Sequence, residues 1–364
     1  MGLLHRRVLG YRACMPIEFN SLDAILNHGF DTVIDVRSPA EFAEDHVPGA
    51  INLPALTDAQ RVGVGTVYKR ISAFDGRKIG AAMVARNVAD HIDGPLATKD
   101  GSWRPLVYCW RGGQRSGSVA TILSQIGWRT EVVQGGYQTF RRLVNHALYD
   151  DPLPHRVVLL DGNTGTAKTA ILARLAARGV QVIDLEGLAG HRGSLLGATA
   201  AGQPSQKAFE TALAVALNGL DPARPVVVEA ESSKIGRIAL PPSLWVAMLA
   251  ARRVVIEAPM QARAAFLTAA YADIIAEPDE VARRLAPLRN LRGHAVVDGW
   301  IALLRGGEFA ALATALMVEH YDAAYTKSRR IDERDVIAVV QAQTLDEVGQ
   351  DRAADAVMAA LSGL

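Results

Sequence analysis

The segment PLVYCWRGGQRSGS, at residues 105–118, decides how the first half of the chain folds. Its first four residues are a continuous apolar run, which indicates a buried strand. Gly112 and Gly113 then allow the backbone to turn sharply, and residues 118–127 place apolar side chains at helical spacing. A strand, a glycine loop and a helix in this order form the repeating unit of parallel α/β folds.

Similar apolar runs of strand length occur on both sides of this segment, separated by stretches with helical spacing. They occupy residues 32–36, 129–133, 157–160, 180–185, 226–231 and 254–259. Strands that alternate with helices predict parallel sheets that helices cover on both faces. From about residue 261 to the end of the chain, the pattern predicts mainly helix.

The length of the chain argues for two domains, because 364 residues are more than twice the usual domain size of about 150. Polar residues and two prolines make residues 150–155 (DDPLPH) the best linker. We therefore expect an extension at residues 1–14, a first α/β domain at 15–150, and a second at 151–364 that includes a helical C-terminal region.

The composition narrows the class of protein. Lysine and arginine number 39 against 38 acidic residues, so no global field attracts nucleic acid, and such a partner needs a local patch. Cys14 and Cys109 are too few for a disulfide framework and too distant for a metal knuckle. No apolar run approaches the roughly 18 residues of a membrane span, and residues 1–14 lack the apolar core of a signal peptide. These features predict a cytoplasmic enzyme.

Cys109 lies at the base of the first glycine loop, between the predicted strand and helix. Successive N–H groups of such a loop point inward and bind an anion at a helix N-terminus. A thiol there, near two arginines, is expected to have a lowered pKa and to attack sulfur, selenium or phosphorus. A buried structural cysteine beside an ordinary turn is the alternative. The candidate anion-binding residues are Arg111, Gly112, Gly113, Gln114 and Arg115.

A second glycine loop, GNTGTAKT at residues 162–169, follows the apolar run at 157–160. It nearly matches the phosphate-binding pattern G-x4-G-K-[ST], in the strand–loop–helix setting that the pattern requires. We expect its N–H groups to cradle a diphosphate, Lys168 to neutralise the charge and Thr169 to ligate Mg²⁺. A glycine turn with a surface lysine is the alternative. The candidate diphosphate-binding residues are Gly162, Thr164, Gly165, Lys168 and Thr169.

Ala167 departs from this pattern, which has glycine before the lysine. A left-handed backbone there costs alanine about 1–2 kcal/mol, so we expect diphosphate binding without required nucleotide hydrolysis. Glu229, or else Glu231, ends the apolar run at 226–231 and is the candidate acidic partner of the metal.

Other candidate contacts lie further along the chain. His191 and Arg192 follow the run at 180–185, where ligands of open α/β sheets bind, although capping of local structure is equally compatible. His320 and Tyr321 are candidates for stacking on an extruded base or for helix core. Basic side chains that could bind nucleic-acid phosphates, or form a solvated helix face, are Arg283, Arg284, Arg289, Arg292, Lys327, Arg329 and Arg330.

Residues 35–54 (DVRSPAEFAEDHVPGAINLP) and 108–116 (YCWRGGQRS) resemble the rhodanese family, over roughly residues 18–150. The resemblance implies a rhodanese-like parallel sheet and a persulfide or perselenide carried on Cys109. Simple rhodaneses usually have C-x4-R, whereas Cys109 and Arg115 are spaced C-x5-R, as in cysteine phosphatases. A loop of that size suits a tetrahedral phosphorus-containing donor.

A rhodanese-like domain followed by a phosphate loop resembles the tRNA 2-selenouridine synthases. The resemblance implies a transferase that replaces the sulfur of 2-thiouridine, at the tRNA wobble position, with selenium from selenophosphate. It also implies geranylation of that sulfur by geranyl diphosphate, with S-geranyl-2-thiouridine as the intermediate. The stretches that carry it lie at residues 64–72, 108–116, 184–197, 203–210, 231–241 and 320–328.

Two other classes of function are compatible with the residues. The C-x5-R loop is equally that of a cysteine phosphatase or an arsenate-reductase-like enzyme, fused here to a kinase-like phosphate-loop domain. A non-catalytic nucleotide sensor or sulfur carrier is the third hypothesis. A phosphatase-like enzyme would release phosphate without any need for selenium. A sensor or carrier would bind its ligand without turnover.

Overall fold

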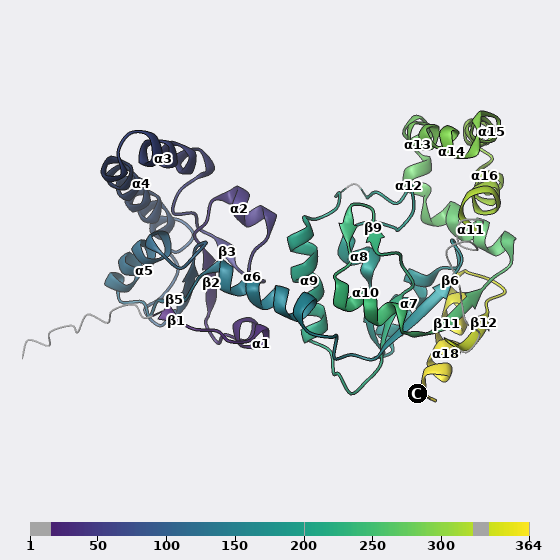
Figure 1. Cartoon of the computed structure of the whole chain (residues 1–364), viewed down its shortest axis with the longest axis horizontal. Coiled ribbons are helices and arrows are strands. Elements are labelled where there is room, and N and C mark those ends of the chain that lie inside the picture. Colours follow the sequence, from purple (N-terminus) through teal and green to yellow (C-terminus); the bar gives the residue numbers. More distant parts are fainter. Residues whose placement is uncertain (1–15, 200, 323–334, 364) are drawn as a thin grey trace, which may run out of the picture. The chain divides into compact units, whose positions relative to one another are not determined.

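The computed structural model describes residues 16–199, 201–322 and 335–363. The chain divides into two compact units, Met1–Ala147 and Leu148–Leu364 (Figure 1). Each unit has its own parallel sheet of five strands. Outside the described residues lie the extension predicted at 1–14, with Cys14, and the basic residues Lys327, Arg329 and Arg330.

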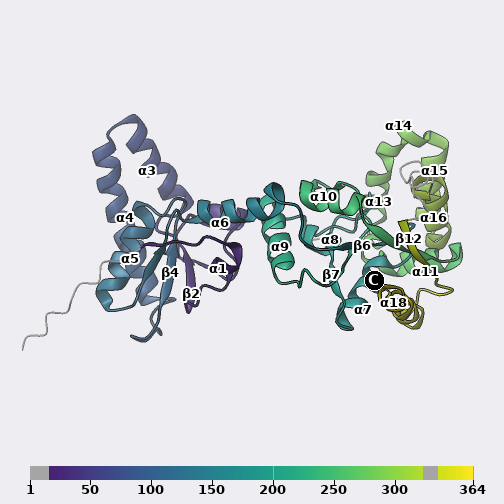
Figure 2. The ribbon, with the colours of Figure 1, turned by 60° about the horizontal axis from the view of Figure 1, so that its bottom comes forward.

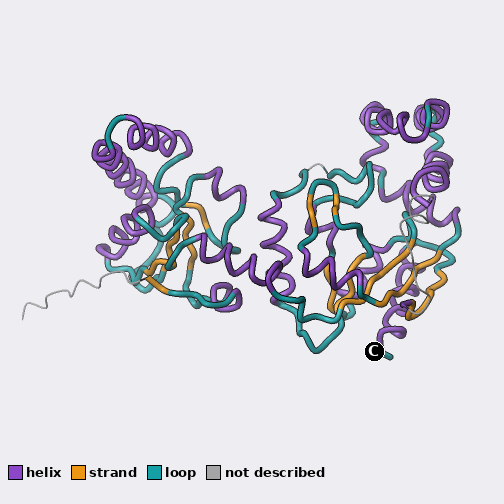
Figure 3. The backbone as a smooth tube through the Cα atoms, viewed as in Figure 1, coloured by secondary structure: helices purple, strands orange, loops and turns teal. Residues whose placement is uncertain are grey.

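The sheet of the first unit has the order β1-β5-β4-β2-β3, and all neighbouring strands are parallel. Figure 3 draws the strands in orange. The strands predicted at 32–36, 105–108 and 129–133 are confirmed. All four side chains of the central strand β4 are buried, so Cys109 emerges at the carboxyl edge of the sheet. The strands are β1 (Pro16–Ile17), β2 (Thr32–Asp35), β3 (Ile51–Asn52), β4 (Pro105–Tyr108) and β5 (Glu131–Val133).

Helices surround this sheet, and two of them extend beyond it. α3 and α4 pack against each other as a long hairpin (Figure 2). No residue of α3 is buried, so its sequence has no apolar face from which a helix is predicted. The helices are α1 (Leu22–Leu26), α2 (Pro39–Glu44), α3 (Asp58–Arg70), α4 (Ala73–Asp93), α5 (Gln114–Ile126) and α6 (Tyr137–Asn145), followed by a π-helical turn (His146–Asp150).

The sheet of the second unit has the order β12-β11-β6-β8-β7, again with all neighbours parallel. The four strands predicted between residues 157 and 259 are confirmed. β6 is central and fully buried, so the phosphate loop follows the middle of the sheet. The strands are β6 (Val157–Gly162), β7 (Gln181–Ile183), β8 (Val226–Glu229), β11 (Arg252–Glu257) and β12 (Val336–Gln341), with a separate hairpin of β9 (Lys234–Ile235) and β10 (Ile238–Ala239).

Helices and single helical turns make up most of the rest of this unit. Among the described helices, none is long and apolar enough to cross a membrane. They are α7 (Lys168–Ala177), α8 (Leu185–Ala189), α9 (Gln206–Asn218), α10 (Pro242–Leu249), α11 (Met260–Ala270), α12 (Ala272–Ile275), α13 (Pro278–Leu285), a 3₁₀ turn (Ala286–Leu288), α14 (Arg289–Arg292), α15 (His294–Arg305), α16 (Phe309–Leu316), a π-helical turn (Met317–Tyr321) and α18 (Glu347–Leu361).

The C-terminal region is mainly helical, as predicted, with one correction. β12 forms the edge of the parallel sheet beside β11, in a segment where the sequence predicts mainly helix. Only one of its six side chains is buried, so the apolar run VIAVV lacks the burial that marks the inner strands. The preceding helices have a separate apolar core around Trp300, which is 1% exposed.

A buried ion pair joins the elements around β4 in the first unit. Arg37 and Asp35 are 1% and 0% exposed, and the guanidinium binds the carboxylate through Nε and Nη2, the latter at 2.6 Å. Arg37 also donates to the carbonyl oxygen of Asp45 at 2.6 Å and lies 3.9 Å from the centre of the Tyr137 ring. The guanidinium therefore connects β2, the loop after α2 and the start of α6.

Removal of one partner of this pair is expected to destabilise the first unit strongly. Arg37→Ala leaves the Asp35 carboxylate buried without its countercharge, which typically costs about 3–5 kcal/mol. Hydrogen–deuterium exchange of β2 and β4 peptides in the full chain measures the loss. Arg104→Ala is the control, because its ion pair with Asp31 is about half exposed and is worth at most about 1 kcal/mol. Equal protection in the two variants would contradict the role of the buried pair.

Candidate functional site

Cys109 is buried between β4 and α5, with 4% of its surface exposed. Its Sγ accepts a hydrogen bond from Ser116 Oγ at 3.2 Å. Burial alone raises the pKa of this thiol, but hydrogen bonds from Ser116 and from the backbone N–H groups of Arg111 and Gly113 outweigh it and lower the pKa. The thiolate therefore lies in the inward-facing N–H loop that the sequence predicts.

A second glycine turn holds this loop in place. Gly136 has φ of +60°, and a Cβ atom there would overlap the carbonyl oxygen of Cys109. The N–H groups of Tyr137 and Gln138 donate to the carbonyl oxygens of Cys109 and Trp110 at 2.8 and 3.1 Å. The backbone after β5 thus satisfies the carbonyl side of the loop, and the N–H side is left for the sulfur and a ligand.

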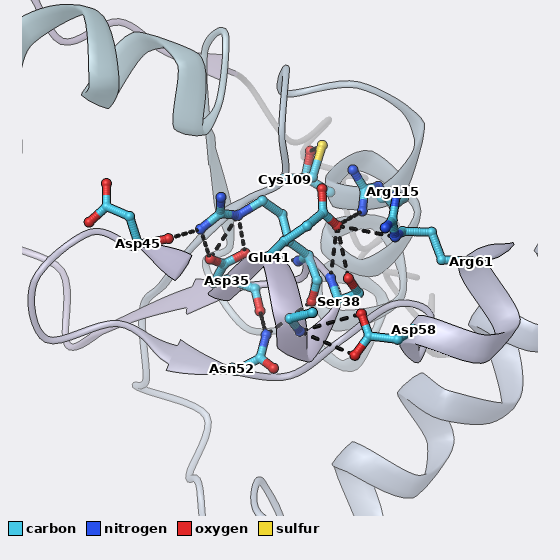
Figure 4. A network of polar contacts seen from close by, with 12 residues as sticks. Asp35, Ser38, Glu41, Asp45, Asn52, Asp58, Arg61, Cys109 and Arg115 are labelled. Atoms are coloured by element: carbon cyan, nitrogen blue, oxygen red, sulfur yellow. Dashed lines mark hydrogen bonds and ion pairs between the residues drawn. The ribbon is translucent and has the colours of Figure 1, made fainter. Parts of the chain in front are cut away.

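The arginines of this loop differ from the prediction in one respect. Arg115 Nη1 pairs with Glu41 Oε2 at 3.0 Å, and Figure 4 shows Glu41 between Arg115 and Arg61. Arg111 and Gln114 are exposed. The lowered pKa of Cys109 is confirmed, but its causes are the N–H groups and the Ser116 hydroxyl and not the arginines.

A wide cavity opens beside this loop. It encloses about 1810 Å³, its mouth included, and is lined by both helices of the α3–α4 hairpin and by Gln114 and Arg115. Tyr68 lines it and is 47% exposed. No residue of α3 is buried, so no apolar face predicts this helix of the hairpin, although residues 64–72 are among those that resemble the synthases.

The phosphate loop of the second unit joins the central strand β6 to α7. Lys168 begins α7, and its Nζ donates to the carbonyl oxygen of Gly162 at 2.9 Å, so the ammonium group lies across the loop. Arg263, which is 5% exposed, binds the carbonyl oxygen of Thr164 through Nε and Nη2, at 2.9 and 2.8 Å. Arg263 was not predicted, and it holds the middle of the loop against α11.

Ala167 has the left-handed conformation that the sequence analysis considered. Its φ of 59° and ψ of 28° make it the only non-glycine residue with positive φ among those described. Its side chain is 4% exposed and packs in the core of this unit with Ile171 and Leu172. Burial of the methyl group therefore offsets part of the backbone cost.

Acidic side chains gather beside Lys168 and Thr169. Thr169 Oγ1 donates to Glu186 Oε2 at 3.1 Å, so Glu186, which was not predicted, is the acid that contacts the phosphate loop. Glu229 is 1% exposed, and neither carboxylate oxygen has a hydrogen-bond partner among the described residues. Glu231 lines the adjoining cavity. No local sequence pattern links Glu186 to this site, because it lies 17 residues after Thr169 and only the fold brings the two side chains together.

Burial and mutual repulsion raise the pKa values of these acids. Burial, then the charge of Glu231, raises the pKa of Glu186 to about 7. Burial, then the charge of Glu186, raises the pKa of Glu229 to about 8. Mg²⁺ usually binds through one or two carboxylates together with phosphate oxygens and water, and the orphaned carboxylate of Glu229 beside Thr169 and Glu186 fits such an ion.

Of the remaining predicted contact residues, Arg192 lies at the phosphate-loop cavity, and several others make contacts within the C-terminal helices. Arg192 lines the phosphate-loop cavity and pairs with Asp273 through both Nη atoms, at 3.0 and 2.8 Å. Burial, then the charge of Arg284, lowers the pKa of His191. His320 accepts from Arg292 and packs edge-on against Trp300, which favours the helix-core interpretation. Three other arginines of the predicted basic set form ion pairs with acids: Arg283 and Arg284 with Glu280, and Arg289 with Asp298.

Two family models match separate parts of the chain. A rhodanese-like domain matches residues 18–143, and a tRNA 2-selenouridine synthase AAA domain matches residues 155–286. The chain pairs a rhodanese-like domain with the AAA domain of the tRNA 2-selenouridine synthases. Both resemblances seen in the sequence are thereby confirmed, and residues 287–364, which include α16, lie beyond both models.

Curated synthases are similar to this chain over part of their length. The tRNA 2-selenouridine synthase of Hahella chejuensis is 40% identical over 236 residues, which are 64% of this chain and 61% of the relative. That of Shewanella loihica is 37% identical over 234 residues, 64% of this chain and 62% of the relative. Each alignment therefore spans just under two thirds of the relative's own length.

Solved structures are similar to about 35% of this chain. A rhodanese-related protein from Thermoplasma volcanium is 20% identical and covers 35% of this chain and 91% of its own, with a TM-score of 0.23. This likeness adds nothing to the topology described above.

Ser116 is expected to stabilise the thiolate of Cys109. Ser116→Ala removes a hydrogen bond to a charged sulfur, so the pKa of Cys109 rises and alkylation at pH 7 slows several-fold. The rate of iodoacetamide labelling, followed against pH by mass spectrometry, measures this shift. Ser118→Ala, at an exposed position of α5, is the matched control. An unchanged pH profile in Ser116→Ala would show that the backbone N–H groups alone set the pKa.

Glu229 is expected to make the second unit less stable at alkaline pH. The folded chain holds protons on Glu186 and Glu229 that the unfolded chain releases above pH 4.5. The resulting stability is complete below pH 4.5 and is lost as pH rises through about 7 to 8. Glu229→Gln removes the buried charge, so its melting temperature should exceed the parent's more at pH 8.5 than at pH 5.

The exposed Glu277→Gln variant is the control for this measurement. It is expected to melt like the parent at both pH values, because it removes no buried charge. A constant difference between Glu229→Gln and the parent at pH 5 and 8.5 would contradict the raised pKa.

Proposed function

We propose that this chain converts wobble 2-thiouridine in tRNA to 2-selenouridine, with selenophosphate as the selenium donor and S-geranyl-2-thiouridine as the intermediate. The observation that carries the proposal is the buried thiol of Cys109 with its lowered pKa, which the Ser116 hydroxyl and the N–H groups of Arg111 and Gly113 hydrogen-bond. The curated names of the relatives and the family model of the second unit support it. The enzyme is then a selenotransferase and a geranyltransferase.

The Cys109 loop is proposed to cleave selenophosphate. The N–H groups of the loop and the Arg115 guanidinium bind the phosphoryl oxygens, and the thiolate attacks phosphorus. An S–P bond forms, the P–Se bond breaks, and selenium leaves with the electron pair. Water then hydrolyses the phosphocysteine to orthophosphate and the free thiol. No oxidant or reductant is needed, whereas the perselenide implied by the rhodanese resemblance requires phosphite release or an oxidant.

The phosphate loop is proposed to bind geranyl diphosphate. Lys168 and the N–H groups of Gly165 and Thr169 hold the diphosphate, which leaves as the thiocarbonyl sulfur of 2-thiouridine attacks the first carbon of the geranyl chain. Bound Mg²⁺ would neutralise the leaving diphosphate, and Thr169 and Glu186 are the side chains placed to hold it. The alkylated sulfur is a better leaving group, and selenide displaces it as geranylthiolate.

Contacts to tRNA are proposed on both units. In the first unit, the cavity between the α3–α4 hairpin and the Cys109 loop is open to a nucleoside. In the second, His191, Arg192 and the exposed Arg283 are candidates for phosphate or base contacts. The proposed location of such an enzyme is the cytoplasm, where its tRNA substrate is found.

A cysteine phosphatase is the second candidate function, and the C-x5-R spacing of Cys109 and Arg115 favours it. It shares the attack on phosphorus and differs in the leaving group, which is an alcohol in place of selenide. Release of phosphate from a small phosphate ester, at a rate comparable to that from selenophosphate, would support this candidate.

Substitutions in the two loops are expected to separate the two half-reactions. Cys109→Ser should abolish selenium transfer and leave geranylation intact, because a serine hydroxyl is not appreciably ionised at neutral pH. Lys168→Ala should weaken geranyl diphosphate binding about tenfold or more and leave selenophosphate cleavage unchanged. Each variant is incubated with 2-thiouridine RNA, geranyl diphosphate and selenophosphate, and the nucleosides are separated by liquid chromatography and mass spectrometry.

Cys14→Ser is the control for the cysteine substitution, since the sequence immediately after Cys14 contains no glycine pair like Gly112 and Gly113. Arg115→Ala should be intermediate, because it weakens oxyanion binding and leaves the nucleophile in place. Formation of 2-selenouridine by Cys109→Ser at the parental rate would show that selenium transfer bypasses this loop.

A further inference from the structure

An apolar cavity lies beside the phosphate-loop cavity of the second unit. Its walls come from α11, α12, α13 and α16, and include Leu267, Ile274, Val281, Leu312 and Leu316. Among the residues that the structure describes, no charged side chain lines it. It encloses about 580 Å³, its mouth included.

The two cavities share the residues at their border. These are Thr164, Ser194, Leu267, Tyr271 and Tyr321, and four of the five carry a hydroxyl group. On one side of the border the walls contain Lys168, Glu186, Arg192 and Glu231. On the other side they are almost entirely hydrocarbon. The lining therefore changes from charged side chains near Lys168 to apolar side chains near Leu316.

Two of the hydroxyl groups at the border are satisfied within the protein. Ser194 Oγ and the Tyr271 hydroxyl lie 2.9 Å apart and hydrogen-bond to each other. Thr268, further in, donates to the carbonyl oxygen of Ala264 at 2.9 Å. An apolar group can pass these side chains without leaving them unpaired, so its entry costs little beyond the loss of chain freedom.

We propose that the apolar cavity binds the hydrocarbon chain of a prenyl diphosphate whose diphosphate occupies the phosphate loop. This inference rests on the proposed geranyl transfer and adds where the chain lies. A ligand that fills both cavities needs a polyanionic head and an uncharged, hydrogen-bond-free tail, joined at the border. The first carbon of the chain, which the sulfur attacks, then lies beside Ser194 and Tyr271.

The same cavity disfavours a nucleoside in that position. A base and a ribose carry several hydrogen-bonding groups, and their burial among Leu312, Leu316 and Ile274 would leave those groups unpaired. We therefore expect the phosphate loop to bind a prenyl diphosphate in preference to a nucleoside triphosphate. The apolar wall distinguishes the two ligands, because both present the same phosphate groups to Lys168.

Ala313 offers a way to fill the cavity without altering the phosphate loop. Ala313 is a half-buried wall residue of α16, and Ala311 is exposed on the same helix. Isothermal calorimetry on the full chain compares inorganic diphosphate, dimethylallyl diphosphate and geranyl diphosphate. In the parent, affinity should rise with chain length, with geranyl diphosphate about tenfold or more tighter than inorganic diphosphate. Ala313→Leu should remove this advantage and leave inorganic diphosphate unchanged, while Ala311→Leu changes neither.

The outcomes distinguish the cavity from the proposed function. If the parent binds neither inorganic nor geranyl diphosphate, the assignment of the phosphate loop is wrong and this inference falls with it. If the parent binds both equally, the phosphate loop assignment stands and the cavity is not the site of the chain. An advantage of geranyl diphosphate that persists in folded Ala313→Leu also overturns the inference.

A labelling experiment covers the case in which Ala313→Leu does not fold. A geranyl diphosphate analogue with a diazirine at the far end of the chain is photolysed on the parent protein, and the labelled peptides are identified. Labels within residues 267–281 and 309–317, competed away by geranyl diphosphate and not by ATP, support the inference. Competed labels confined to other peptides overturn it.

Discussion

Both candidate sites depend on backbone N–H groups that remain free at the carboxyl end of a central parallel strand. A strand inside a sheet gives all its N–H groups to its neighbours, so free donors appear only where the chain leaves the sheet and turns into a helix. In the first unit this turn contains Gly112, with φ of +65°. In the second it contains Gly165, with φ of +84°, and Ala167, with φ of 59°. The positive φ values keep the donors directed inward.

The two loops are held open by different means. In the first unit, the backbone after β5 occupies the carbonyl groups of Cys109 and Trp110, while the Asp35–Arg37 pair and the Tyr137 ring support it from below. In the second, the Arg263 guanidinium binds the carbonyl oxygen of Thr164. In both cases groups of the protein bind carbonyl oxygens of the loop.

The sequence predicted what local pattern and spacing encode, and it missed what only packing brings together. The inner strands and both glycine loops were predicted because burial, glycine and the phosphate-loop pattern are local features. β12 was missed because an edge strand with one buried side chain lacks that burial, and the α3–α4 hairpin because α3 has no buried face. Glu186 and Arg263 were missed because their contacts with Thr169 and Thr164 join distant parts of the chain. The functional roles of the site residues remain proposals.

The charge of the phosphate-loop cavity constrains how its ligand binds. Lys168 and Arg192 face Glu186 and Glu231, with Glu229 buried behind them, and Arg192 is already paired with Asp273. A diphosphate added to this set would meet more negative than positive charge. Burial first, and then the charges of neighbouring acids, raise the pKa values of Glu186 and Glu229 to about 7 and about 8, so these acids retain protons near neutral pH. In the proposed reaction, a divalent cation that enters with the diphosphate as those protons leave would balance the charge, so diphosphate binding and metal binding would be coupled electrostatically.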